Sequence, residues 1–422
     1  MSAVEKNHQK TQTQTDDMSS SIFAPLSLPE SAPAAARAVF RLMKSLRHGT
    51  LSVQMPDGTT VLFGTPGEGG LRAAIRLRNW NVCAQAMKSG DIGFAETFIA
   101  GDWSSPDLVA LLKLFIANRD EVEQVIYGTW WGSLLYRVKH VFNRNSRGGS
   151  KRNIHAHYDL GNEFYSLWLD PTMNYSSAWF DGDLGAPMEA AQWAKVHRAL
   201  RECGVKPGDR VLEIGCGWGA LAQSAARDFG ATVTGVTLSR EQLDWARKRL
   251  ADAKLPGELR LQDYRDIDDG PYDAIASIEM FEAVGREYWP GFFKALRAQL
   301  KPGGRACIQS IVIRDDLFDR YVKSTDFIQQ YIFPGGLLPS PSEFRKAAAS
   351  AGLAVVNELD FGGDYAETLR RWRERFLAEG ARVRRLGFDA RFMHIWEFYL
   401  AYCEAAFATG NTSVMQFTLT QA

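Results

Sequence analysis

From Arg210 onward, short apolar runs alternate with longer stretches whose apolar residues recur at helical spacing. Apolar runs separated by helices are typical of buried strands in a parallel sheet. The last two runs are separated by a helical, aromatic-rich segment that we expect to cap a site. The pattern predicts an α/β, doubly wound fold. Its strand candidates are RVLEIGC, TVTGVT, ELRLQD, YDAIASI, GRACIQSIVI, LAVVNELDF (Leu353 to Phe361) and SVMQFTLT (Ser413 to Thr420).

The first part of the chain has a different pattern. Residues 1–21 are polar and are expected to form a disordered tail. Leu51 to Gly64 alternates around the turn former Pro56-Asp57-Gly58, which predicts a β-hairpin. Between Arg72 and Asn118 apolar residues recur at helical spacing, interrupted at Gly101-Asp102-Trp103. We therefore predict a small α+β domain over residues 22–127.

A basic connector is expected over residues 128–152. The stretch from Arg137 to Arg152 contains six Lys or Arg residues, no acidic residue and a Gly-Gly-Ser break. It is either a solvated linker or a segment that contacts anionic lipid headgroups, where each basic residue contributes about 1 kcal/mol. The sequence leaves both interpretations open.

Composition excludes several classes of function. The 422 residues carry a formal net charge of zero, so no general attraction to nucleic acid is expected. The five cysteines are scattered, without metal-ligand spacing, which favours a reduced cytoplasm and predicts no metal site. The apolar stretch from Leu108 to Ala117 is too short to span a bilayer, so any membrane contact is expected to be peripheral.

A glycine-rich loop follows the first of these strands. In VLEIGCGWGAL, the glycines Gly215, Gly217 and Gly219 permit close approach of a ligand to the backbone at a helix N-terminus. The spacing is GxGxG rather than the GxGxxG of dinucleotide sites, and no acid stands at the end of the second strand. Asp263-Tyr264 and the segment from Ser277 to Glu282 follow later strands. All are expected at the carboxyl edge of the sheet, where ligands bind.

From about Asn153 to the C-terminus the chain resembles the cyclopropane fatty acid synthase family, which includes the mycolic acid cyclopropane synthases. The N-terminal domain carries a weaker likeness. The segments that carry the resemblance, in family order, are HYDLGNEFYSLWLDPTMNYSSAWF (His157 to Phe180), VLEIGCGWG, GVTLSREQ (Gly235 to Gln242), LQDYRD (Leu261 to Asp266), MFEAVG (Met280 to Gly285), YIFPGGLLPS (Tyr331 to Ser340) and DYAETL (Asp364 to Leu369).

The resemblance implies a class I S-adenosylmethionine-dependent methyltransferase domain over residues 153–422, with a seven-stranded, mostly parallel sheet and a helical insertion before the last strand. It implies methyl transfer to the double bond of unsaturated acyl chains in membrane phospholipids. The N-terminal domain is then expected to engage lipid, in a homodimer at the inner face of the membrane. The implied cofactor residues are Tyr175, Ser176, Gly215, Gly217, Gly219, Thr237, Leu238, Gln242, Tyr264, Arg265 and Ile278.

Methyl transfer to an alkene leaves a carbocation, which aromatic faces stabilise and which must lose a proton. In the family a bound bicarbonate is the expected acceptor, and the matching pocket here is Ser177, Glu282, Gln309, Ile311 and Tyr365. Serine and glutamine replace the family's cysteine and histidine, and Ala283 stands where relatives commonly carry histidine. Because Gln309 cannot carry a positive charge, we hypothesise that the proton is lost elsewhere, which would give a methyl-branched or methylene product instead of a cyclopropane.

Three further residues could have a catalytic or a structural role. Cys403 matches a family cysteine and is a possible nucleophile, although its apolar helical setting favours a buried thiol. His155 and His157 are expected to position a loop over the cofactor.

Two other functions stay open at this point: a methyltransferase for small molecules, and a lipid-binding protein with a decayed active site.

Overall fold

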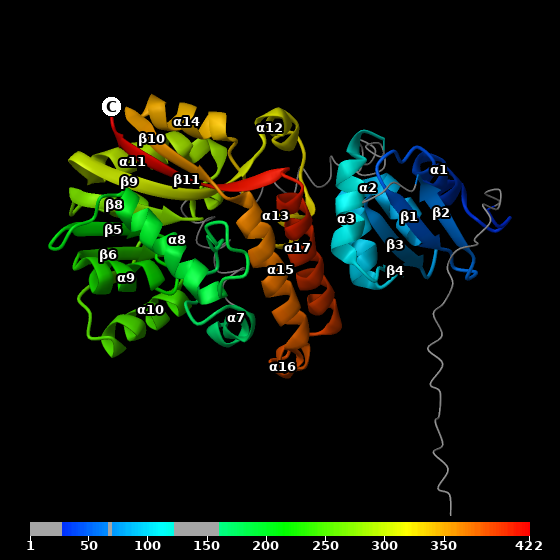
Figure 1. Ribbon diagram of the computed structural model, residues 1–422, viewed down its shortest axis with the longest axis horizontal. Coiled ribbons are helices and arrows are strands. Elements are labelled where there is room, and N and C mark those ends of the chain that lie inside the picture. Colours follow the sequence, from blue (N-terminus) through cyan, green and yellow to red (C-terminus); the bar gives the residue numbers. More distant parts are fainter. Residues whose placement is uncertain (1–27, 66–69, 122–159) are drawn as a thin grey trace, which may run out of the picture.

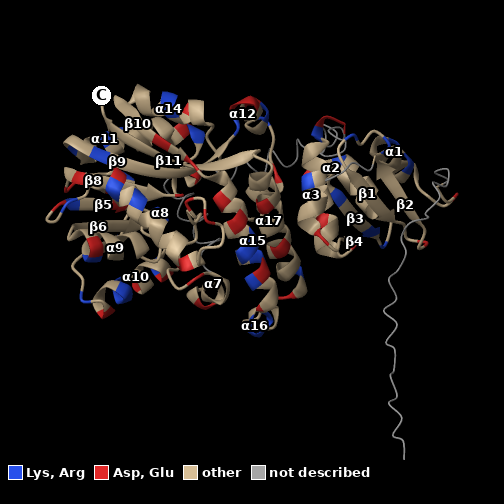
Figure 2. Ribbon diagram, in the orientation of Figure 1, with Lys and Arg blue, Asp and Glu red and all other residues tan. Residues whose placement is uncertain are grey.

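The computed structural model describes residues 28–65, 70–121 and 160–422. The predicted tail (1–21) and basic linker (128–152), with His155 and His157, lie outside these residues. Two units are visible in Figure 1, a small N-terminal one and a larger C-terminal one built on a second sheet. Acidic and basic side chains are mixed over the same helices, α15 (Gly362–Ala378) among them (Figure 2).

The N-terminal unit has a four-stranded sheet in the order β2-β1-β3-β4. Its strands are β1 (Thr50–Gln54), β2 (Thr60–Gly64), β3 (Arg72–Leu77) and β4 (Trp103–Ser104), and its helices are α1 (Ala34–Met43), α2 (Asn81–Ala100) and α3 (Leu108–Ala117). The predicted hairpin is confirmed, since β1 and β2 pair antiparallel. Gly101 ends α2 in a left-handed conformation, with φ 80°, which explains the interruption in the helical pattern.

The expectation of helix from Arg72 was wrong for its first residues. Arg72–Leu77 is strand β3, which pairs parallel with β1. Ile75 and Leu77 are buried on either side of the exposed Arg76, so the period there is two residues. A six-residue segment is too short for the helical period to be told from alternation by eye.

The C-terminal unit has the seven-stranded sheet that the resemblance implied, and its strand order is β10-β11-β9-β8-β5-β6-β7. Strands β9, β8, β5, β6 and β7 are parallel, and β11 pairs antiparallel with β9 and β10. The strands are β5 (Arg210–Ile214), β6 (Thr232–Thr237), β7 (Glu258–Leu261), β8 (Tyr272–Ile278), β9 (Leu300–Ile313), β10 (Leu353–Asp360) and β11 (Thr412–Gln421).

Helices cover both faces of this sheet (Figure 1), and each face has its own apolar core. One face packs α8 (Met188–Glu202), α9 (Ala220–Phe229) and α10 (Arg240–Asp252), and the other packs α11 (Trp289–Gln299) and α14 (Pro341–Ser350). The remaining helices are α7 (Asn162–Trp168), α12 (Asp315–Tyr321), α13 (Phe327–Tyr331), α16 (Gly380–Arg385) and α17 (Ala390–Ala408), with the 3-10 turns η1 (Tyr264–Asp266), η2 (Phe281–Ala283) and η3 (Arg286–Tyr288).

The predicted helical insertion is α15 to α17, between β10 and β11. Helix α17 packs against α15 on one side and against α2 and α3 of the N-terminal unit on the other. One continuous apolar cluster therefore joins the two units, with Leu111 and Leu114 of α3 and Phe398 and Leu400 of α17 among its buried members. In the part of the chain that is described, no helix combines the length and apolarity needed to cross a membrane.

Candidate active site

The glycine loop lies between β5 and α9. Gly215, Gly217 and Gly219 all have positive φ, at 84°, 48° and 80°, a region that other residues rarely adopt. A Cβ on Gly219 would come within 2.8 Å of the Ala246 Cβ on α10, so glycine also permits the close packing of these two helices. The loop therefore follows the path that the sequence predicted, with its amides at the start of α9.

Beside this loop is a cavity of about 160 Å³, formed at the carboxyl ends of β5, β6, β7 and β8. Every residue expected at the cofactor lines it except Gly219, which packs against α10. The Ser239 side chain caps α10 by accepting a hydrogen bond from the Gln242 backbone N–H. Arg265 forms an ion pair with Asp263 at 2.6 Å. These contacts fix two walls of the cavity.

A second, apolar cavity of about 190 Å³ adjoins the first. Tyr175, Glu279 and Ala283 line both cavities and so form the border between them. Beyond that border the walls are mainly apolar or aromatic, including Ile311, Ile328, Phe333, Leu337, Leu369, Tyr399 and Phe407. Such a space suits a hydrocarbon chain that ends beside a polar site.

The expected anion pocket is present, but a side chain already fills it. The Glu279 carboxylate accepts hydrogen bonds from the Ser177 backbone N–H at 2.8 Å, from Gln309 Nε2 at 2.7 Å and from the Tyr365 hydroxyl at 2.7 Å. The Ser177 hydroxyl instead donates to the Ala178 carbonyl at 2.8 Å. Because these donors are taken, the pocket does not fit bicarbonate, whose binding the replacements at Ser177 and Gln309 had already put in doubt.

Hydrogen bonds set the orientation of the Gln309 amide. Arg198 Nη1 donates to Gln416 Oε1 at 2.6 Å, and the Gln416 Nε2 donates to Gln309 Oε1 at 3.0 Å. Since arginine can only donate, each amide in the series must present its oxygen to the preceding donor and its NH₂ group to the next acceptor. The Gln309 NH₂ group is thereby directed at Glu279.

Glu282 has a different environment from Glu279. One carboxyl oxygen accepts from the Ile311 backbone N–H, and the other, Oε2, is buried without a hydrogen-bond partner. Burial, followed by repulsion from Glu279, raises the Glu282 pKa to about 8. Glu282 is therefore largely protonated at neutral pH.

Lys195 supplies a buried positive charge. Its ammonium donates to Ser176 Oγ at 2.6 Å, and its side chain is fully buried on the sheet-facing side of α8. Burial lowers the Lys195 pKa to about 8, while attraction to Glu279, Asp170 and Glu213 opposes that shift. Burial also raises the Glu279 pKa, and Lys195 together with the three hydrogen bonds counteracts it.

Cys403 lies on α17 in the wall of the apolar cavity. Burial raises the pKa of its thiol well above the ordinary value, which keeps it uncharged and disfavours a nucleophilic role. Of the aromatic side chains near the site, Tyr175 and Tyr365 line this cavity, whereas Phe281 is fully buried in the core beneath α11. The Tyr175 and Tyr399 hydroxyls are 2.6 Å apart, which fixes both rings in the cavity wall.

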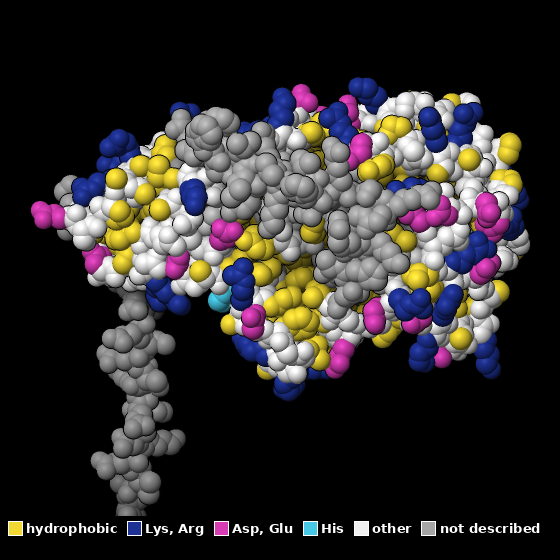
Figure 3. All heavy atoms as spheres, turned by 180° about the vertical axis from the view of Figure 1, so that it is seen from behind, with side chains coloured by type: hydrophobic (Ala, Val, Ile, Leu, Met, Phe, Trp, Pro, Cys, Tyr) yellow, Lys and Arg dark blue, Asp and Glu magenta, His cyan; other side chains and the backbone are white. Residues whose placement is uncertain are grey.

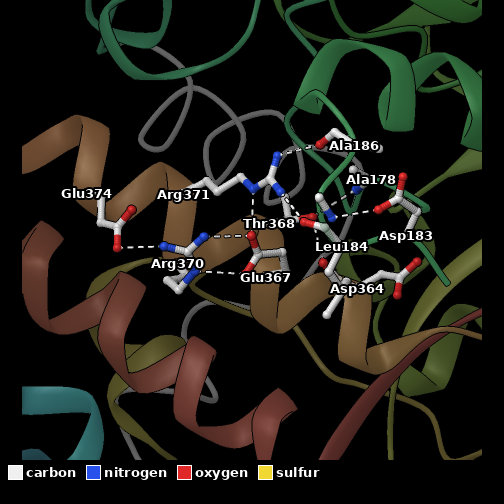
Figure 4. Close-up of polar contacts among 11 residues, drawn as sticks. Ala178, Asp183, Leu184, Ala186, Asp364, Glu367, Thr368, Arg370, Arg371 and Glu374 are labelled. Atoms are coloured by element: carbon white, nitrogen blue, oxygen red, sulfur yellow. Dashed lines mark hydrogen bonds and ion pairs between the residues drawn. The ribbon is translucent and has the colours of Figure 1, made fainter. Parts of the chain in front are cut away.

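Helix α15 anchors the loop that carries Ser177 (Figure 4). Arg371 donates to the Ala186 carbonyl at 2.8 Å and to the Leu184 carbonyl at 2.6 Å. Thr368 Oγ1 accepts from the Ala178 N–H at 3.2 Å, and the Asp364 carboxylate accepts from the Phe180 N–H at 2.6 Å. Tyr365 lies on the same helix, so one element positions two of the three donors to Glu279.

The resemblance placed Ser177, Glu282, Gln309, Ile311 and Tyr365 together. In the structure Ser177, Gln309 and Tyr365 meet at Glu279, and Ile311 donates to the neighbouring Glu282. Sequence reasoning missed Glu279, although the residue stands in the segment expected at the sheet edge. It also missed Lys195 and Gln416. A signal for Lys195 was available, because the spacing Ala191, Lys195, Ala199 places a charge on the buried face of α8.

A first prediction concerns pH and stability. The folded-state pKa of Glu282 lies above its ordinary value of 4.5, so the stability that its proton contributes is present below pH 4.5 and is lost as the pH rises through about 8. The unfolding free energy of the wild type should therefore fall between pH 5 and 8.5 by at least ~2 kcal/mol more than that of Glu282→Gln, measured by urea denaturation. Glu287→Gln, at an exposed position nearby, is the control. Parallel curves for the wild type and Glu282→Gln would contradict the assignment.

A second prediction compares two neighbouring arginines of α15. Arg371 and Arg370 both pair with Glu367, but only Arg371 reaches the 184–186 loop. Arg371→Gln should lower the unfolding free energy by ~1–3 kcal/mol because two loop carbonyls lose their donor. Arg370→Gln removes only surface ion pairs and should cost less than ~1 kcal/mol in the same denaturant titration. Equal losses in the two variants would show that the loop contacts do not matter.

The sequence of this chain is similar to those of several known proteins. Residues 145–417 match the family described as mycolic acid cyclopropane synthetase. The chain is 39% identical over 404 residues to the tuberculostearic acid methyltransferase UfaA1 of Mycobacterium tuberculosis, with 93% of this chain and 92% of that protein covered. It is 34% identical to the cyclopropane-fatty-acyl-phospholipid synthase of Escherichia coli K12, covering 82% and 88% of the two chains.

Solved structures agree with the sequence relatives. The crystal structure of mycolic acid cyclopropane synthase CmaA1 complexed with SAH and CTAB superposes with a TM-score of 0.61 at 31% identity, covering 64% of this chain and 98% of that one. Within the described residues, the two cavities and the glycine loop lie in the part of the chain that the family match covers. The chain therefore belongs to the mycolic acid cyclopropane synthetase family and is an S-adenosylmethionine-dependent methyltransferase that acts on lipids.

Proposed function

We propose that this enzyme transfers a methyl group to a double-bond carbon in an unsaturated acyl chain of a membrane phospholipid. The observation that carries the proposal is the apolar cavity that adjoins the cofactor cavity at Tyr175, Glu279 and Ala283. A hydrocarbon chain in that cavity would present its double bond at the border. With the family shown, we set aside the small-molecule methyltransferase and the non-catalytic lipid-binding protein.

The cofactor cavity has the chemistry to hold S-adenosylmethionine. Its glycine loop offers backbone amides, and Gln242, Asp263 and Arg265 offer polar groups along the wall. When bound, S-adenosylmethionine supplies an electrophilic methyl group on sulfur. The residues of this chain would align that methyl group with the alkene and keep water from the reacting carbons.

Aromatic side chains at the border would stabilise the cation that forms on the acyl chain. Tyr175, Tyr365 and Tyr399 line the apolar cavity, and the Tyr365 ring packs at 4.3 Å from the Phe407 ring. The face of an aromatic ring attracts a nearby cation by ~0.5–2 kcal/mol, and more in a dry site than in water. Rings held by hydrogen bonds and packing need no rearrangement when the charge develops.

We further propose that the N-terminal unit extends the acyl site. A cavity of about 230 Å³ lies between this unit and the C-terminal unit, lined by Phe40, Leu51 and Ala86 from the one and by Phe398 from the other. It shares Tyr321, Asp326, Leu338, Tyr402, Ala406 and Thr412 with the apolar cavity. Hydrophobic side chains also gather on one face of both units (Figure 3), which favours peripheral contact with the membrane. The inner face of the membrane and a homodimer stay predictions.

The experiment that tests the reaction uses purified enzyme, methyl-deuterated S-adenosylmethionine and vesicles of a defined monounsaturated phospholipid, followed by mass spectrometry of the acyl chains. We expect labelled chains. Loss of one deuterium indicates a cyclopropane or a methylene group, which hydrogenation separates. Retention of all three indicates a methyl branch formed by loss of a chain proton. Unlabelled chains from an enzyme that binds the cofactor would overturn the proposal.

Two kinds of product are compatible with this reaction, a cyclopropane and a methyl-branched or methylene chain. A relative at 39% identity is named a tuberculostearic acid methyltransferase and one at 34% a cyclopropane synthase. The similarity of both to this chain supports a methyl-branched or methylene product as the second candidate beside the cyclopropane. The deuterium count and hydrogenation in the same assay decide between them.

A variant at the junction of the two apolar cavities tests the extended acyl site. Ala406 lines both of them, so Ala406→Phe should block the passage. The expected result is a shift of at least tenfold in kcat/KM toward substrates with fewer carbons beyond the double bond. Ala408→Phe, exposed on the same helix, is the matched control and should retain the wild-type chain-length profile. An unchanged profile in Ala406→Phe would exclude the N-terminal cavity as part of the acyl site.

A further inference from the structure

We propose that Glu279 is itself the catalytic proton acceptor, its side-chain carboxylate taking the place of the external anion that the resemblance led us to expect. This inference rests on the proposed methyl transfer to an alkene. It departs from the expectation drawn from the sequence, in which the replaced cysteine and histidine left the pocket without an effective base.

The pocket surrounds Glu279 as it would surround a bound anion. Donors reach both oxygens of the carboxylate: Ser177 N–H and Gln309 Nε2 contact Oε1, and the Tyr365 hydroxyl contacts Oε2. Ser177 and Gln309 are fully buried, and the series from Arg198 through Gln416 directs the Gln309 NH₂ group at the carboxylate. Three of the five residues assigned to anion binding therefore donate hydrogen bonds to the Glu279 side chain.

Charge around the pocket selects which of the two glutamates is ionised. Burial raises the pKa of both carboxyl groups; attraction to Lys195 opposes the rise at Glu279, whereas repulsion from Glu279 adds to it at Glu282. Two adjacent carboxylates do not both ionise readily, and Glu279, with three hydrogen-bond donors, is better able to carry the charge than Glu282, whose Oε2 has no hydrogen-bond partner. A base whose affinity for protons is raised by burial is also better matched to catalysis near neutral pH.

Glu279 is placed where the proton is released. It lines both the cofactor cavity and the apolar cavity, at the border where the methyl group meets the alkene. The π electrons form a bond to the methyl carbon as the S–C bond breaks, giving S-adenosylhomocysteine and a cation on the adjacent chain carbon. A methyl C–H bond then breaks, and its proton goes to Glu279.

The electron pair of that C–H bond has two possible fates. It closes a cyclopropane directly, or, after a hydride shift along the chain, it forms the double bond of a methylene group. Both outcomes balance with one proton on Glu279 and one deuterium lost from a labelled methyl group. The substitutions at Ser177 and Gln309 therefore do not by themselves require a different site of proton loss.

The backbone conformation at Glu279 indicates a variant that should fold. Glu279 has φ 49°, a left-handed conformation that glycine adopts more readily than glutamate. Glu279→Gly should consequently fold, and it opens the pocket by removing the carboxylate while its donors remain. Glu279→Gln keeps the pocket filled with a side chain of nearly the same shape that cannot accept the proton.

We expect both variants still to bind S-adenosylmethionine, as measured by calorimetry, and to lose ~10²- to 10⁴-fold in acyl methylation at saturating cofactor in buffer free of bicarbonate. Added bicarbonate should restore activity to Glu279→Gly and not to Glu279→Gln, and should leave the wild-type rate unchanged. Carbon-13 NMR of labelled bicarbonate should detect binding to Glu279→Gly and none to the wild type.

Other results would overturn the inference. A wild-type rate that depends on bicarbonate, or variants as active as the wild type, would show that Glu279 is not the acceptor while the methyl transfer to acyl chains stands. Absence of labelled acyl chains from the wild type itself would instead remove the proposed function, and this inference with it.

Discussion

A carboxylate placed inside a protein must be compensated by hydrogen-bond donors and by a nearby positive charge, or it takes up a proton. Glu279 meets this constraint with three donors that come from distant parts of the chain: the loop at Ser177, strand β9 at Gln309 and helix α15 at Tyr365. The buried Lys195 adds the charge from α8. The C-terminal unit therefore brings four groups, the three donors and the Lys195 ammonium, to the same carboxylate.

The sheet makes this convergence possible. Ile278 at the end of β8 is in register with Gln309 on β9, because β9 continues past the end of its neighbour, and Gln416 of the antiparallel β11 pairs with Gln309 on the other side. The residue that follows Ile278 is therefore presented directly to the Gln309 amide. The helical insertion between β10 and β11 supplies Tyr365, and its α17 continues the apolar core into the N-terminal unit.

Much of this arrangement could be predicted from the sequence. All seven strands of the large sheet were found from their apolar runs, and the glycine loop was placed by its spacing, because both depend on local periodicity. Strand β3 was missed because six residues do not define a period. Glu279 could not be singled out from the sequence, because Glu282 is the glutamate that matches the family motif and no local pattern indicates which of two glutamates three residues apart will meet the donors.

The backbone at Glu279 explains why the site is unusual in energetic terms. A left-handed conformation costs a non-glycine residue roughly 1–2 kcal/mol. It persists only if the interactions of the side chain stabilise the folded state by more than this amount. Hydrogen bonds to a charged group contribute ~1.5–3 kcal/mol each, so three of them exceed the strain. Glycine at this position would relieve the strain but leave the donors of Ser177, Gln309 and Tyr365 in need of an acceptor from solution. A covalently attached carboxylate removes that requirement and holds the base at the border of the two cavities without any loss of translational freedom when the anion is needed.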